Sequence, residues 1–145
     1  MKIRNWMRVA AVLQTLFAFG HTVGGTPRVA ERGAQEAALF DAMQNFRFDV
    51  TGTNRSHWVF YQGFSLTVGL YLLIAAVLFW QLGELSRREP ATARPPITTL
   101  AIGEIGLAIL SFQYFFIVPA MFSIVISFCL VTAVFLSYRG DIAAG

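Results

Sequence analysis

Four segments of the chain are long, apolar and almost free of charged residues, and they cover residues 6–23, 58–82, 97–117 and 120–138. A helix that crosses a lipid bilayer needs about 20 mostly apolar residues, and each segment is close to that length. Between residues 97 and 138 the only charged side chain is that of Glu104. One helix of that length would measure about 63 Å, twice the roughly 30 Å hydrocarbon core. The chain must therefore turn back near Pro119, which predicts two antiparallel neighbouring helices.

The longest polar segment, residues 24–57, separates the first two predicted spans. Within it, residues 33–46 carry the apolar side chains of Leu39, Met43 and Phe46 at helical spacing. Acidic and amide side chains lie between them. This stretch is too short and too polar to cross a membrane. It predicts an amphipathic helix that lies on the mouth of the helix bundle or on the lipid surface.

Glycine and proline mark the other connections. Two glycines and a proline at residues 24–27 predict the end of the first helix. Residues 84–96 contain three arginines and three prolines, which predicts a charged, non-helical turn. The first apolar segment also fits a signal peptide with a cleavage site at residues 18–20. Gln14, in the middle of that segment, favours the membrane-crossing helix instead.

The composition agrees with lipid as the main solvent of the chain. Hydrophobic residues make up 56% of the sequence and charged residues 13%, whereas a soluble domain has roughly 45–50% and about 25%. We therefore predict an all-α membrane protein with a single domain over residues 1–145. Four transmembrane helices would form an up-down bundle with one long outer loop.

The distribution of charge predicts the orientation of this bundle. The N-terminus, the 84–96 segment and Arg139 hold seven lysines and arginines, whereas residues 24–57 hold four, balanced by four acids. Because positive charge accumulates on the cytoplasmic side, both termini should be cytoplasmic in a multi-pass protein of the inner membrane. The net charge of +3 is small and scattered, which argues against a nucleic-acid partner.

Polar side chains inside the predicted spans indicate a ligand pocket. An ionisable group inside a membrane costs roughly 2.5–3.5 kcal/mol, so Glu104 should face protein or water. Gln14 and His21 share one face of the first helix, because they are seven residues apart. With Gln62 and Ser65 of the second helix, these residues are predicted to line an outward-opening polar pocket. In the alternative interpretation, the amides and serine only join helices by hydrogen bonds and His21 caps its helix.

A second set of polar and small residues is predicted to pack helices together: Gly103, Gly106, Gln113, Ser123 and Ser127. Gln113 lies nine residues after Glu104, which is half a turn out of phase with it on a straight helix. It therefore suits a contact with the fourth helix or with another subunit. Small residues allow such helices to approach closely.

The outer loop is predicted to carry a polar cluster of Asp49, Arg55 and His57, with an ion pair between Asp49 and Arg55. No spacing typical of a metal site supports metal binding by these residues. Cys129 is the only cysteine, so it forms no internal disulfide and no redox pair. The chain contains no catalytic motif, and we expect neither a catalytic residue nor a bound metal or cofactor.

Four short motifs carry a resemblance to a known group of proteins: His21-Thr22-Val23-Gly24, Phe48-Asp49-Val50-Thr51-Gly52 with Arg55, Tyr61-Gln62-Gly63-Phe64-Ser65 and Trp80-Gln81-Leu82. Over about residues 17–83 the chain resembles an uncharacterised family of small bacterial four-helix integral membrane proteins. The resemblance implies a four-helix membrane fold and no particular activity. It involves these positions: His21, Gly24, Asp49, Gly52, Arg55, Gly63 and Phe64. In its size and lone membrane acid the chain is also similar to the small multidrug resistance transporters. Their acid lies in the first helix, where this chain has Gln14.

Three hypotheses on function follow. In the first, a non-enzymatic membrane protein binds an apolar or amphipathic small molecule or a lipid in the outward pocket, or is a subunit of a homo-oligomer or larger membrane complex. In the second, a dimeric, proton-coupled transporter exports cationic apolar compounds, and Glu104 exchanges a proton for substrate. In the third, which has the least support, an intramembrane enzyme uses His21 as a base.

Overall fold

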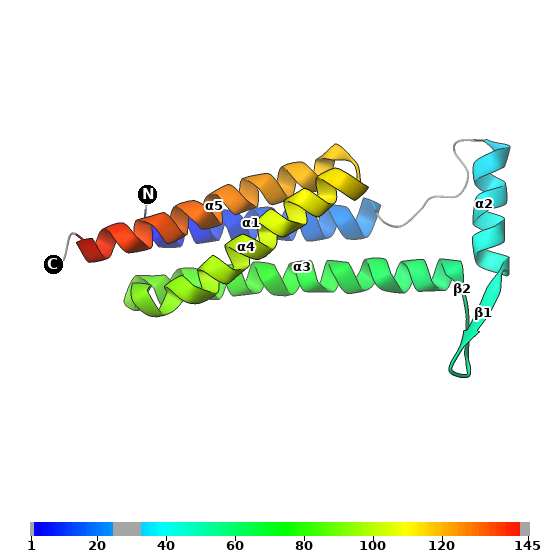
Figure 1. The fold of residues 1–145 in the computed structure, drawn as a ribbon, viewed down its shortest axis with the longest axis horizontal. Coiled ribbons are helices and arrows are strands. Elements are labelled where there is room, and N and C mark those ends of the chain that lie inside the picture. The colour runs from blue at the N-terminus through cyan, green and yellow to red at the C-terminus, as the bar shows by residue number, and fades with distance from the viewer. Residues whose placement is uncertain (1, 25–32, 143–145) are drawn as a thin grey trace. The chain divides into compact units, whose positions relative to one another are not determined.

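The structure is a computed structural model that describes residues 2–24 and 33–142. These residues form five helices and one two-stranded sheet: α1 (Ile3–Gly24), α2 (Ala34–Asn45), β1 (Arg47–Val50), β2 (Thr53–Ser56), α3 (His57–Arg88), α4 (Pro90–Tyr114) and α5 (Ile117–Ile142) (Figure 1). The described chain is thus predominantly helical, as predicted, and α2 occupies the segment with amphipathic spacing. α1 ends at Gly24, and the remainder of the predicted stop at residues 25–27 lies outside the described residues.

Among the described residues, three helices are long and apolar enough to cross a membrane: α3, α4 and the Ile117–Arg139 part of α5. Their outer surfaces carry large apolar side chains, such as Phe64, Phe112 and Phe128, which are 62–74% exposed. A soluble monomer rarely exposes apolar patches of more than a few hundred Å², so this surface suits contact with lipid. α1 also lies where a helix was predicted, and its crossing of the membrane stays a prediction.

The prediction of a non-helical turn at residues 84–96 is wrong. α3 continues to Arg88, and α4 begins at Pro90 after the single residue Glu89. Proline is tolerated in the first turn of a helix, because the N–H group that it lacks has no partner there. Pro95 and Pro96 lie further inside α4. The arginines of this segment therefore stand on helix ends and not on a loop.

The polar segment between α2 and α3 contains a β-hairpin that the sequence interpretation left as a loop. β1 and β2 pair in antiparallel register, with Phe48 opposite Arg55 and Asp49 opposite Asn54. Thr51 and Gly52 connect the strands and have φ values of 51° and 80°. Positive φ at both central residues is the geometry of the type I′ turn that favours two-residue hairpins.

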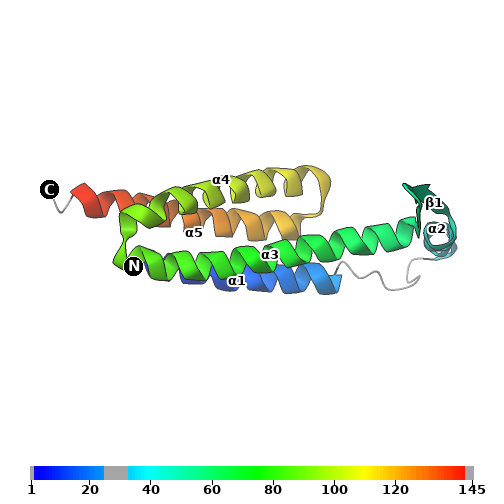
Figure 2. The same cartoon turned by 90° about the horizontal axis from the view of Figure 1, so that it is seen from below.

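The described chain divides into two compact units, and each is described by itself. Unit 1 comprises Met1–Ala18 and Leu72–Gly145, and unit 2 comprises Phe19–Tyr71. In unit 1, α4 and α5 lie side by side, as their short connection predicts (Figures 1 and 2). Trp6 of α1 meets Phe128 of α5 edge to face at 5.8 Å between ring centroids. Further along, the rings of Phe17 and Phe122 stack at 5.4 Å. The part of α1 up to Ala18 is therefore packed within unit 1.

Small side chains allow the helices of unit 1 to approach closely. The interior is built mostly from alanines and serines, with a few large apolar residues such as Met7, Phe79 and Ile97 that are fully buried. At Gly83, an added Cβ would lie 3.0 Å from the Cβ of Met7. The end of α3 and the start of α1 are thus in contact at a glycine.

In unit 2, aromatic side chains join the hairpin and α2 to the start of α3. The ring of His57 lies 4.8 Å from that of Phe48 and 5.3 Å from that of Phe46. Phe40 of α2 meets Trp58 edge to face at 5.5 Å. In the part of unit 2 that the structure describes, no residue of α2 is buried. The apolar side chains of α2 are therefore accessible to another surface.

Candidate functional site

Two of the predicted pocket residues, Gln14 of α1 and Glu104 of α4, are buried next to each other in unit 1. The Gln14 side chain is fully buried and Glu104 is 6% exposed. The amide of Gln14 lies beside the carboxyl group of Glu104, where the two side chains interact. The sequence places them at similar depths in their helices, and the packing of α1 in unit 1 brings them together.

This pair leaves hydrogen-bonding capacity unused. Oε1 and Nε2 of Gln14 and Oε2 of Glu104 are buried and have no partner with normal hydrogen-bond geometry in the described chain. A buried polar group without a partner costs about 1–3 kcal/mol, and more if it is charged. Two of these unpartnered atoms, Oε1 of Gln14 and Oε2 of Glu104, are acceptors, and Nε2 of Gln14 is a donor.

Three buried serines add polar groups to the interior of unit 1. Ser111 of α4 is 2% exposed and lies seven residues after Glu104, so it shares the face of that residue. Ser123 and Ser127 of α5 are buried, and their Oγ atoms have no partner among the described groups. Counted from the turn between α4 and α5, Ser127 stands at about the level of Glu104.

The other residues of the predicted packing set point outward. Gln113 is exposed, in agreement with its half-turn offset from Glu104. An added Cβ at Gly103 or Gly106 would have no neighbour within 4 Å. Within the described chain these two glycines make no close contact with α5, and their predicted contact with another subunit stays a prediction.

His21 and Ser65, two further residues of the predicted pocket, are in contact in unit 2. Nε2 of His21 lies 3.1 Å from the carbonyl oxygen of Ser65 and 3.5 Å from its Oγ. One turn further along α3, an added Cβ at Gly69 would lie 2.7 Å from Oγ1 of Thr22. The end of α1 and the first half of α3 thus approach closely through small and polar residues. Gln62 is half-buried, three residues before Ser65.

The five predicted pocket residues therefore form two pairs in the structure, with Gln62 near the second. Gln14 and Glu104 belong to unit 1, whereas His21 and Ser65 belong to unit 2. A single pocket that contains all of them stays a prediction.

The predicted ion pair between Asp49 and Arg55 does not form. Oδ1 of Asp49 accepts a hydrogen bond of 3.0 Å from the backbone N–H of Gly52, and Nη1 of Arg55 donates to the carbonyl oxygen of Asn54. The reason is the hairpin register, in which Arg55 stands opposite Phe48. Because successive side chains of a strand point to opposite faces, Asp49 and Arg55 lie on different faces of the hairpin.

The third member of the loop cluster, His57, is the first residue of α3. It contacts the rings of Phe46 and Phe48, as described above, and neither Asp49 nor Arg55. The structure thus does not bring the three residues together. Among the residues that the structure describes, no group of three or more His, Cys, Asp or Glu could hold a metal ion.

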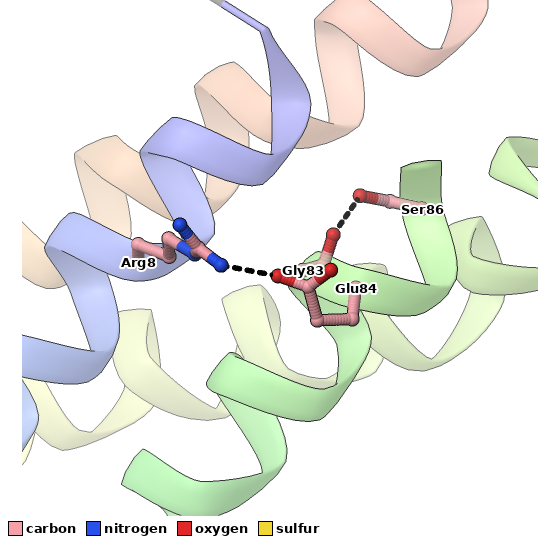
Figure 3. A network of polar contacts seen from close by, with 4 residues as sticks. All are labelled: Arg8, Gly83, Glu84 and Ser86. Carbon is pink, nitrogen blue, oxygen red and sulfur yellow. Dashed lines mark hydrogen bonds and ion pairs between the residues drawn. The ribbon is translucent and has the colours of Figure 1, made fainter. Parts of the chain in front are cut away.

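An ion pair between Arg8 and Glu84 was missed by the sequence interpretation. Nη2 of Arg8 lies 2.5 Å from Oε1 of Glu84, and both side chains are 39% exposed. The guanidinium group also lies over the ring of Trp80, 4.7 Å from its centroid. Figure 3 shows Arg8 directed at Glu84, and the Ser86 hydroxyl directed at the carbonyl group of Gly83, to which it donates a hydrogen bond of 2.9 Å. Opposite charges at the same predicted membrane face were a signal for this pair.

We expect a double-mutant cycle of Arg8→Gln and Glu84→Gln to give a coupling energy of about 1 kcal/mol, because the pair is only partly hydrated. The measurement is the free energy of unfolding in detergent for the wild type, both single variants and the double variant. Glu89→Gln is the matched control, because Glu89 lies in the connection between α3 and α4 and forms no ion pair with Arg8. If the coupling energy between Arg8→Gln and Glu89→Gln equalled that between Arg8→Gln and Glu84→Gln, the Arg8–Glu84 ion pair would make no specific contribution to stability.

Arg94 of α4 joins this helix to α5 near the charged ends of both helices. Its Nε donates to Oγ of Ser137 at 3.0 Å and its Nη2 donates to the carbonyl oxygen of Ser137 at 2.9 Å. Its guanidinium group lies 4.0 Å from the ring centroid of Tyr138. Both views in Figures 1 and 2 place the start of α1, the junction of α3 with α4 and the end of α5 at one end of unit 1. This basic end carries Lys2, Arg4, Arg8, Arg87, Arg88, Arg94 and Arg139.

Comparisons with protein-family models, with curated proteins and with solved structures gave no match. The resemblance to small bacterial membrane proteins therefore stays a prediction.

Proposed function

We propose that this chain is a non-enzymatic, multi-pass protein of the inner membrane that binds amphipathic small molecules with a cationic or hydrogen-bond-donating group. Gln14 and Glu104 would hold that group. Three helices of sufficient length and apolar character support the membrane placement. The observation that carries the ligand assignment is the buried Gln14–Glu104 pair with unpartnered polar atoms.

The packing of α1 supports a fourth span. At 1.5 Å per residue its 22 residues extend about 33 Å, which is sufficient for the hydrocarbon core. Its contacts with α5 through Trp6 and Phe17 favour a position beside helices that are apolar enough to cross. The basic end would then be cytoplasmic, because positive charge accumulates on that side. Both termini would lie there, and the hairpin with α2 would lie outside.

The chemistry of the Gln14–Glu104 pair favours a cation over an anion. The carboxylate of Glu104 repels anions and attracts a positive group, and the Gln14 amide offers a neutral acceptor beside it. Intramembrane acids are costly, and they commonly mark substrate or ion pathways. An apolar body attached to the cation would be compatible with the many exposed aromatic and aliphatic side chains around the bundle.

The proposal predicts that Glu104→Gln weakens the binding of a lipophilic cation. Tetraphenylphosphonium is a suitable probe, with binding to the purified protein in detergent measured by calorimetry. We expect a loss of affinity of roughly tenfold or more, because the variant loses the attraction between the carboxylate and the phosphonium charge, and two opposite charges about 4 Å apart attract each other by about 4 kcal/mol at an effective dielectric constant of about 20. Glu89→Gln removes an acid outside the buried site and should bind as the wild type does. Equal affinity of Glu104→Gln and wild type, or no binding by the wild type, would contradict the proposal.

The same buried acid favours a second candidate function, proton-coupled export of cationic apolar compounds. Glu104 would release a proton when a cation binds and take it up again when the cation leaves. The two functions differ in a vesicle experiment. Proteoliposomes with an imposed pH gradient should accumulate tetraphenylphosphonium if the protein is a transporter, and Glu104→Gln should abolish the accumulation. Binding without gradient-driven accumulation supports the first function.

A further inference from the structure

A cavity of about 400 Å³ lies between the start of α1 and the end of α3, at the basic end of unit 1. It is lined by Lys2, Ile3, Arg4, Ser86 and Arg87. Three of these five residues are cationic and none is acidic. The cavity belongs neither to the Gln14–Glu104 pair nor to the predicted outward pocket.

The positive charge around this cavity lacks an acidic partner among the described side chains. Glu84 is the acid on the neighbouring turn of α3, and it is engaged by Arg8. Nε of Arg4 is buried and has no hydrogen-bond partner in the described structure. The first turn of α1 contains no acidic residue that would balance the positive end of the helix dipole. Ser86 donates its hydroxyl proton to the carbonyl oxygen of Gly83 (Figure 3), so the other side-chain donors of the lining are those of the three cations.

Close helix contact fixes the position of these cations. The backbone carbonyl oxygen of Arg4 lies 3.6 Å from the position of an added Cβ at Gly83, beside the Met7 contact. Arg4 and Arg87 are therefore held on two helices that touch at this point. Since like charges repel unless an anion lies between them, a cavity with this lining favours occupation by an anion.

We infer that this cavity binds the phosphate group of an anionic phospholipid. Arginine recognises phosphate oxygens through paired N–H donors, and lysine adds a point charge. The volume is within the range of small-molecule sites, about 300–1,000 Å³. Arg8 over Trp80 lies close by, and tryptophans of membrane proteins concentrate at the level of the lipid headgroups. Basic pockets between transmembrane helices on the cytoplasmic side bind such headgroups. The inference depends on membrane placement, and it does not depend on ligand binding at Glu104.

The test is a lipid titration of the purified, delipidated protein in a neutral detergent, with thermal unfolding as the readout. Phosphatidylglycerol should raise the unfolding temperature more than phosphatidylcholine, whose headgroup carries its own cation. Arg4→Gln and Arg87→Gln should each weaken the apparent affinity for phosphatidylglycerol about fivefold, the effect of one cation near an anionic lipid surface. Lys2→Gln should also weaken binding, and it leaves folding intact because Lys2 precedes α1.

Arg88→Gln is the matched control, because Arg88 stands at the same helix end and does not line the cavity. It should keep wild-type affinity for phosphatidylglycerol. An equal loss in Arg88→Gln and Arg4→Gln would overturn the inference, since general surface charge would then explain the binding. Millimolar glycerol phosphate and inorganic phosphate are the soluble arms of the titration. If either one protects as well as phosphatidylglycerol does, the ligand is a soluble phosphate and the lipid assignment is wrong.

Discussion

Gly83→Leu should destabilise the protein by about 3 kcal/mol or more, and Gly83→Ala by less, because the higher helix propensity of alanine offsets part of the steric strain. The Cβ of any side chain at this position would lie 3.0 Å from the Cβ of Met7, which is tighter than nine in ten such contacts in proteins. Met7 is fully buried, and its Cβ is fixed to the backbone of α1. Relief of the clash therefore requires that α1 and α3 move apart, which would also disturb the Arg8–Glu84 contact on the same turns.

The measurement is the free energy of unfolding in detergent, followed by the loss of helical circular dichroism. Gly103→Ala is the matched control, because it is also a glycine inside a helix of unit 1 and an added Cβ there has no neighbour within 4 Å. Alanine is favoured over glycine in a helix by about 1 kcal/mol, so Gly103→Ala should be neutral or stabilising. If Gly83→Ala were as stable as Gly103→Ala, the close approach of α1 and α3 would not exist in the protein.

The helices were predictable because each depends on a long local pattern. The apolar runs and the spacing of Leu39, Met43 and Phe46 specify helix formation without reference to distant residues. The prolines of the 84–96 segment misled the interpretation because their effect depends on position. Pro90 lies in the first turn of α4, where a missing N–H group costs little. No residue in this segment indicates that α4 begins at Pro90 and not after Pro96.

The hairpin was less predictable, because its turn is made by Thr51 and Gly52. A β-branched residue at positive φ is uncommon, so the sequence lacks the usual Asn-Gly or Asp-Gly signal of such a turn. Once the hairpin forms, its register separates Asp49 from Arg55. The ion pair was expected from proximity in sequence alone, which does not determine the face of a strand.

Side-chain pairs between helices were predictable only where both the depth of each residue in the membrane and its face of the helix were considered. Gln14 and Glu104 were matched by depth, and His21 and Ser65 by their position near the outer helix ends. The Arg8–Glu84 pair needed the same reasoning at the charged end, where both residues had been counted only as flanking charges. Which glycines touch a neighbour, Gly83 or Gly103, depends on helix rotation in the packed unit, which sequence spacing does not supply.

Removal of the buried polar pair should make the protein more stable. Gln14→Met and Glu104→Met replace buried polar side chains by an apolar one of similar length. Because Oε1 and Nε2 of Gln14 and Oε2 of Glu104 have no normal hydrogen-bond partner in the described chain, each change should raise the free energy of unfolding by about 1–3 kcal/mol. The two gains should not add, since the two side chains are neighbours.

Gln113→Met is the matched control, because it makes the same chemical change on α4 at an exposed position. We expect no comparable gain there. Unfolding in detergent would be measured for all three variants, together with tetraphenylphosphonium binding. A gain in stability with a loss of binding in Gln14→Met and Glu104→Met is the combination expected of a ligand site, since functional groups are kept at a cost in stability. If both variants were instead destabilised, the amide and the carboxyl group would be satisfied within the folded protein. The pair would then be a structural contact between α1 and α4, and the assignment of a cationic ligand would lose the observation on which it depends.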